Sequence, residues 1–186
     1  MFIQTEATPN PATLKFLPGR AVLNQGTAEF RSAETAATSP LAEALFHVDG
    51  VTGVFLAREF VTVTKRDDTQ WDDLKPSVLA TLMEHFASGR PALNESATQA
   101  AHKAGDAADA EIVSQIVELL DTRVRPAVAA DGGDITFHGF ENGVVFLHMQ
   151  GSCAGCPSST LTLKAGIENM LRHYIPEVTE VRAIAA

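Results

Sequence analysis

The stretch that decides how this chain is interpreted is residues 151–160, GSCAGCPSST, which contains both cysteines of the protein, Cys153 and Cys156. An apolar run typical of a strand precedes it at residues 144–149, and apolar residues at helical spacing follow it. Pro157 suits the first turn of a helix, where a backbone N–H is not needed. The cysteines are therefore expected on a loop between a strand and a helix. Because a helix N-terminus has unpaired N–H groups and a partial positive charge, this position favours thiolate over thiol.

Two thiolates at this spacing can bind neighbouring irons of one iron–sulfur cluster, but a cluster with four cysteine ligands needs twice the sulfurs of one chain. Two copies would complete the site if a twofold axis brought their cysteine pairs together. Two alternatives stay open. A thioredoxin-like redox pair also lies between a strand and a helix, although too little chain follows Cys156 for the further strands of that fold. A zinc site would need two more ligands, and His148 is the only close candidate.

Size and composition are typical of a globular protein. The 186 residues suffice for one well-buried domain or two small ones, and no apolar run approaches the roughly 18 to 20 residues that span a bilayer. The net charge of −9 argues against nucleic acid or an anionic membrane surface as a partner. Residues 1–6 lack the features of a secretory signal. The chain is expected to be cytoplasmic in a bacterium, or a processed form in the mitochondrial matrix.

The predicted fold class is α+β, with two small domains that each pack a short β-sheet against helices and are joined by a flexible linker. Residues 1–93 form the first domain, in which a hairpin over residues 51–65 and a helix over residues 71–87 are the clearest patterns. Residues 94–109 contain no large aliphatic or aromatic residue and are the expected linker. Residues 110–186 form the second domain, in the order helix, strand, strand, cysteine loop, helix, strand.

No enzyme active site is expected. Asp131 and Asp134 flank two glycines, and this pattern indicates a turn rather than a pair of acid–base carboxylates. The histidines show no i,i+4 pair, and the chain has no glycine-rich phosphate loop or Gly-x-Ser-x-Gly nucleophile motif.

Both halves resemble parts of one known family. The second half resembles the NifU-like C-terminal domain in Arg125-Pro126, in residues 131–134, DGGD, in residues 151–161 and in residues 176–178. The first half resembles the Nfu N-terminal domain in residues 8–11, TPNP, in Lys15-Phe16 and in the hairpin up to Lys65. Together the two resemblances cover almost the whole chain.

The resemblance implies an iron–sulfur cluster carrier of the Nfu type. Such a carrier is a homodimer that binds a 4Fe–4S cluster through Cys153 and Cys156 of both chains, with a 2Fe–2S form also open. It receives the cluster from an upstream assembly scaffold and delivers it to apo iron–sulfur proteins. Because the chain has no further cysteines, it lacks the scaffold and ferredoxin-like domains of full-length NifU. Transfer is therefore expected rather than de novo assembly, and docking of target proteins is our hypothesis for the first domain.

Overall fold

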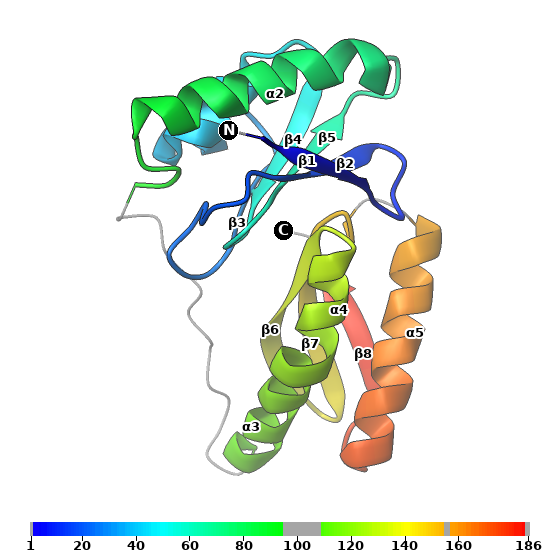
Figure 1. Ribbon diagram of the computed structural model, residues 1–186. Coiled ribbons are helices and arrows are strands. Elements are labelled where there is room, and N and C mark those ends of the chain that lie inside the picture. The colour runs from blue at the N-terminus through cyan, green and yellow to red at the C-terminus, as the bar shows by residue number, and fades with distance from the viewer. Residues whose placement is uncertain (1, 95–108, 155–156, 185–186) are drawn as a thin grey trace. The chain divides into compact units, whose positions relative to one another are not determined.

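The computed structural model describes residues 2–94, 109–154 and 157–184, with the backbone alone at residues 157–159 (Figure 1). The chain divides into two compact units, Met1–Ala100 and Ala101–Ala186. Each unit packs one β-sheet against helices, so the predicted α+β class with two such parts is confirmed. The linker predicted at residues 94–109 lies, apart from its two end residues, outside the described part of the chain.

The first unit has a five-stranded antiparallel sheet in the order β1-β2-β5-β4-β3. Two α-helices cover one face of it (Figure 1) and share one buried cluster with the strands. The predicted hairpin is present as β4 and β5, whereas the three-residue strand β3 had no sequence pattern long enough to reveal it. The elements are β1 (Gln4–Ala7), β2 (Thr13–Leu17), β3 (Ala28–Phe30), η1 (Thr35–Thr38), α1 (Pro40–Phe46), β4 (Val51–Leu56), β5 (Val61–Lys65) and α2 (Trp71–Ser88).

Short-range chemistry sets the ends of these helices. The Ser39 hydroxyl accepts a hydrogen bond of 3.0 Å from the N–H of Ala42, and Pro40 occupies the first position of α1. Gly89 ends α2 in the left-handed conformation with φ 69°, which costs a residue without a Cβ little. Among the helices that the structure describes, none combines the length and hydrophobicity of a transmembrane segment.

The second unit has a three-stranded sheet in the order β6-β7-β8, with β6 and β7 antiparallel and β7 and β8 parallel. The β6–β7 turn consists of Asn142 and Gly143 at φ 50° and 79°, the positive values that a two-residue hairpin turn requires. The elements are α3 (Ala110–Leu119), η3 (Leu120–Val124), α4 (Arg125–Ala130), β6 (Gly133–Glu141), β7 (Val144–Gly151), α5 (Pro157–Tyr174) and β8 (Glu180–Ile184).

The helices of this unit cover one face of its sheet. Alternate strand residues such as Ile135, Leu147 and Val181 are fully buried in one cluster with residues of α3, η3, α4 and α5. The predicted arrangement of three strands under helices on one face is therefore confirmed. The opposite face carries the residues between them, including His148.

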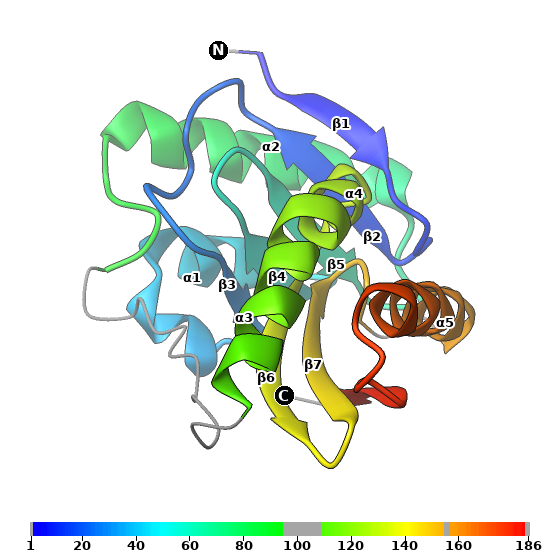
Figure 2. The ribbon, with the colours of Figure 1, turned by 90° about the horizontal axis from the view of Figure 1, so that it is seen from below.

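The sequence predicts an end or a kink near Arg125-Pro126 followed by a short helical stretch to Ala130, and in the structure the chain stays helical through Ala130. Figure 2 shows α3 and α4 in line as one helical rod, and a π-helical segment, η3, joins them. Proline has no N–H to bond within a helix, and its ring clashes with the preceding turn. The wider turn of η3 directly before Pro126 is consistent with relief of that clash, so the chain stays helical and places Arg125 over the start of β6.

Candidate functional site

The cysteine loop, residues 152–156, connects β7 to α5 as the sequence predicts. Gly151 ends β7 with φ 66°, and its carbonyl accepts a 3.1 Å hydrogen bond from the N–H of Ala154, so the chain turns sharply there. Cys153 lies within this turn. Cys156 lies outside the described residues, so the structure places one of the two predicted ligands and leaves the other as a prediction.

The DGGD segment, residues 131–134, holds the start of the cysteine loop through hydrogen bonds with Ser152. The N–H of Ser152 donates to the carbonyl of Gly132 over 3.2 Å, and the Ser152 hydroxyl donates to the carbonyl of Asp131. Gly133 pairs with Gly151 at the end of the β6–β7 ladder. The two segments are far apart in sequence and lie against one another in the fold, because β6 and β7 form a hairpin.

Gly133 makes room for the sulfur of Cys153. A Cβ atom at this position would lie 2.5 Å from the Cys153 Sγ and 2.8 Å from the carbonyl oxygen of Gln150. Both distances are far below van der Waals contact, so a larger residue would displace the loop. Sequence reasoning interpreted this glycine as part of a turn and missed its contact with the cysteine. The repeated glycine in the DGGD segment was the available signal.

An ion pair anchors the DGGD segment to the helices. Arg125 donates two parallel hydrogen bonds to the Asp134 carboxylate, from Nε over 2.8 Å and from Nη2 over 2.9 Å. Arg125 also reaches Asp121 in η3 over 3.1 Å. Hydrogen bonding and charge from Asp134 raise the pKa of the Arg125 guanidinium above its ordinary value. This pairing gives Asp134, only 4% exposed, a structural role.

The environment of Cys153 differs from the sequence-based expectation. The residue is only 6% exposed and belongs to the buried cluster of the second unit. Burial raises the pKa of the Cys153 thiol to about 11, and the carboxylates of Asp131 and Asp134 add to the increase, while a hydrogen bond with Ser152 opposes it. The prediction that this position favours thiolate is therefore wrong for Cys153 in this state, because burial disfavours the charged form of the thiol.

The first turn of α5 is tied to the cysteine loop. The Thr160 hydroxyl donates to the carbonyl of Cys153 over 3.0 Å. His148, the histidine considered as a zinc ligand, lies in β7 between the buried residues Leu147 and Met149, and so on the sheet face opposite to the cluster that contains Cys153. Within residues 2–94, 109–154 and 160–184, no three His, Cys, Asp or Glu side chains come together as a metal site.

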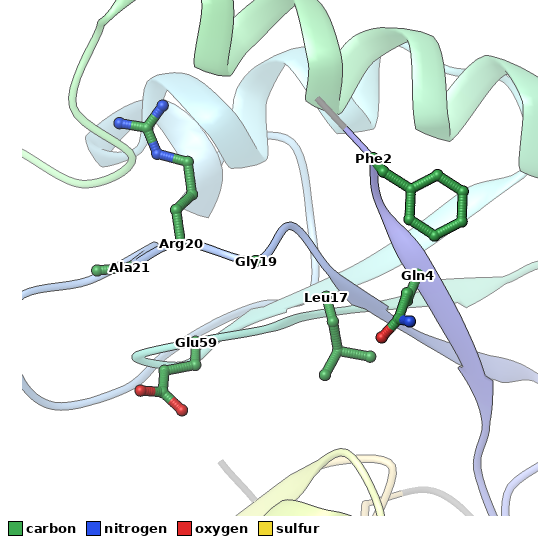
Figure 3. Close-up of a pocket in the computed structure, with 7 residues that line it drawn as sticks. All are labelled: Phe2, Gln4, Leu17, Gly19, Arg20, Ala21 and Glu59. Carbon is green, nitrogen blue, oxygen red and sulfur yellow. The ribbon is translucent and has the colours of Figure 1, made fainter.

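A separate cavity of about 420 Å³ lies in the first unit. Figure 3 shows the side chains around it, with Arg20 and Glu59 pointing in opposite directions. The Arg20 guanidinium lies 5.5 Å from the centre of the Phe86 ring. The cavity is lined by Phe2, Gln4, Leu17, Gly19, Arg20, Ala21 and Glu59.

Comparison with known proteins agrees with both resemblances. Residues 3–89 match the family described as scaffold protein Nfu/NifU N terminal, and residues 116–182 match the NifU-like domain. The chain is 53% identical over 184 residues to the mitochondrial NifU-like protein 5 of Arabidopsis thaliana, a match that covers 97% of this chain and 67% of that protein. It is 51% identical over 185 residues to the mitochondrial NFU1 iron-sulfur cluster scaffold homolog of Homo sapiens, covering 99% and 72% respectively.

The chain thus spans about two thirds of the length of these relatives. Among solved structures, a NifU-like protein from Saccharomyces cerevisiae is similar at 24% identity and a TM-score of 0.47 over 51% of this chain and 86% of that one, a likeness too weak to add to the assignment. The two matched domains and the identity of more than 50% over nearly the full chain are sufficient to assign the family. This protein belongs to the Nfu family of iron–sulfur cluster scaffold proteins.

Proposed function

We propose that the protein is an iron–sulfur cluster carrier rather than an enzyme. It binds a 4Fe–4S cluster between two copies of the chain, through Cys153 and Cys156 of each, and transfers it to apo iron–sulfur proteins. The observation that carries the proposal is the cysteine loop, which offers half of the thiolates of a four-cysteine site and is held between the DGGD segment and α5. The name of the human relative supports the scaffold role, and the names of both relatives support a mitochondrial location. Our proposal is the mitochondrial matrix for a processed chain and the cytoplasm for a bacterial one.

Loading requires a change at Cys153. Only the thiolate binds iron, and this thiol is buried with a raised pKa. The sulfur must therefore leave the cluster of apolar side chains and lose its proton as iron binds. A ligand that prefers its buried, protonated form is also one that an incoming thiol can replace, which favours transfer over permanent storage.

Transfer then proceeds by ligand exchange. Thiolates of the apo target replace those of the carrier one at a time, and each released carrier thiol takes up a proton. Two thiolates per chain at the junction of two copies hold the cluster less permanently than four on one chain, because separation of the copies removes half the ligands together. An upstream assembly scaffold supplies the cluster, because the chain has no cysteines besides the two that hold it and so none for a separate assembly site.

Anaerobic reconstitution with iron and sulfide tests this function. Absorption and Mössbauer spectroscopy should identify a 4Fe–4S cluster, and native mass spectrometry should find it in a species of two chains. Cys153→Ala and Cys156→Ala should each abolish cluster binding and leave the apo fold intact by circular dichroism. A full cluster on a single chain, or on either variant, would show the proposal to be wrong.

Further measurements separate the two alternatives. A thiol–disulfide oxidoreductase would reduce insulin disulfides with a rate that depends on both cysteines. The raised pKa of Cys153 does not favour this chemistry, since the attacking thiol in such proteins has a lowered pKa. A zinc-stabilised module would be isolated colourless with bound zinc and would unfold in chelator.

A further inference from the structure

The first half of α5 presents an exposed face without an exposed charged residue. Leu161 is 66% exposed, the most exposed large apolar side chain among the described residues of the second unit. Thr162 and Ala165 are exposed on the same side of the helix. The first exposed charged residue of α5 is Arg172, about three turns beyond Leu161. We call Leu161, Thr162 and Ala165 the Leu161 face.

The position of this face distinguishes it from an ordinary exposed leucine. A single exposed apolar residue needs no explanation. Leu161, however, lies only about 6 Å along the helix axis from Pro157, at 1.5 Å per residue, and Pro157 directly follows Cys156. The first turn is also bonded to Cys153 through Thr160. Whatever approaches the cysteine loop therefore also approaches Leu161.

Charge indicates which surfaces two copies can bring together. Each chain carries a net charge of −9, so two copies repel one another on average. The Leu161 face offers apolar area for contact, and the nearest charged residues of the helix, Lys164 and Glu168, are opposite in sign and half-buried. In a twofold assembly the same patch of each chain makes the contact, so an uncharged patch is self-complementary where a patch of one charge is not.

We propose that the Leu161 face is the contact surface between the two copies that share a cluster. This inference rests on the proposed function, which requires two chains to meet at their cysteine loops. The contact is small, so it holds two chains together only while a shared cluster bridges them. The chains separate when the cluster leaves. It also keeps water away from the thiolates, which slows loss of the cluster before a target arrives.

The test compares Leu161→Glu with Met83→Glu in the full chain. Met83 is an exposed apolar residue of α2 in the other unit, so its change adds the same charge away from the cysteines. Each variant is reconstituted anaerobically with iron and sulfide, and the rate of cluster loss to an iron chelator and the protein concentration at which the pair separates are measured. Leu161→Glu should raise both by at least about tenfold, while Met83→Glu and Leu161→Met should match the wild type.

Melting of the apo chains shows that the variants are folded, and Leu161→Ser, with a smaller expected change, replaces Leu161→Glu if the latter is not. If the wild type forms a cluster-bound pair and Leu161→Glu matches it, the inference is wrong and the proposed function stands. If Leu161→Glu slows only delivery to a target, the face binds targets and the inference is again wrong. A cluster held by a single wild-type chain would show that the proposed function itself is wrong.

Discussion

At the scale of single residues, the surroundings of a side chain decide its chemistry more than its type or its place in a motif. Cys153 belongs to a motif that favours thiolate, but its side chain is buried beside the carboxylates of Asp131 and Asp134. His85 belongs to no sequence motif that predicts a special role. Its side chain is nevertheless only 2% exposed, and its two ring nitrogens have no hydrogen-bond partner among the described residues. Both residues should respond to pH in ways that can be measured.

The Cys153 thiol should react slowly with iodoacetamide at neutral pH. With its pKa raised to about 11, its thiolate fraction at pH 7 is on the order of 100-fold below that of a free cysteine. In a Cys156→Ser chain without cluster, the alkylation rate measured by mass spectrometry should rise with pH until about 11. The folded-state pKa of this thiol exceeds its unfolded-state pKa. The contribution of the buried thiol to the free energy of unfolding is therefore present below pH 9 and is lost as the pH rises through 11. A rate that levels off near pH 8.5 would contradict the prediction.

Acid should destabilise the first unit through His85. Burial, followed by the charge of Arg90, lowers the pKa of this histidine below 6.5. The unfolded chain therefore binds a proton more readily, so this contribution to stability is present above pH 6.5 and is lost as the pH falls towards the folded-state value. Urea unfolding at several pH values should show a weaker acid dependence for His85→Leu than for the wild type. His47→Gln, at an exposed histidine of the same unit, is the control.

At the scale of elements, the cysteine loop owes its position to the junction of η3, α4 and β6. Arg125 couples the helical rod to Asp134 at the start of β6, and the neighbouring Gly133 contacts the sulfur of Cys153. A change at this junction should therefore affect the cysteine although it alters no ligand.

Gly133→Ala should destabilise the second unit by about 1–3 kcal/mol, because its Cβ would overlap the Cys153 Sγ and a backbone carbonyl that cannot move freely. Urea unfolding measures the loss, and the cluster content after reconstitution should fall with it. Gly139→Ala in the same strand is the matched control, since no heavy atom lies within 4 Å of its new Cβ. Equal effects of the two changes would show that the contact with the sulfur is unimportant.

Asp134→Asn should also destabilise the second unit, by about 1–3 kcal/mol, because it removes the negative charge and one of the two acceptors of Arg125 at a position where the Asp134 side chain is buried. Glu180→Gln removes one side of the exposed pair with Arg182 and should leave the free energy of unfolding nearly unchanged. Urea unfolding of both variants distinguishes a structural ion pair from a surface one; the expectation fails if the two variants are equally stable.

At the scale of the whole molecule, the two units have separate cores. We propose the domain bounds 1–93 and 110–186, with target docking as the function of the first. A chain of residues 94–186 should then fold and bind a cluster as the full chain does, because the residues described in contact with Cys153 belong to the second unit. Its delivery of the cluster to an apo target, followed by recovery of target activity, should be slower. Unchanged delivery would show that the first unit does not dock target proteins.

Local patterns were enough to predict most of the architecture. Alternation over residues 51–65, a cap and proline before α1 and an Asn-Gly turn after β6 each act within a few residues of sequence, so the elements and their order followed from them. The three-residue β3 and the π-helical geometry of η3 were not predicted, because partner strands and packing decide them.

The sequence by itself determined the family and the place of the two cysteines: a strand-to-helix loop in a chain that matches the Nfu family along nearly its whole length. Only the tertiary structure decided the state of the sulfur and what holds it. Gly133 and Asp134 lie far from Cys153 in sequence and reach it through hairpin pairing. Burial, which raises the pKa of the thiol, is a property of the assembled core and not of any local pattern.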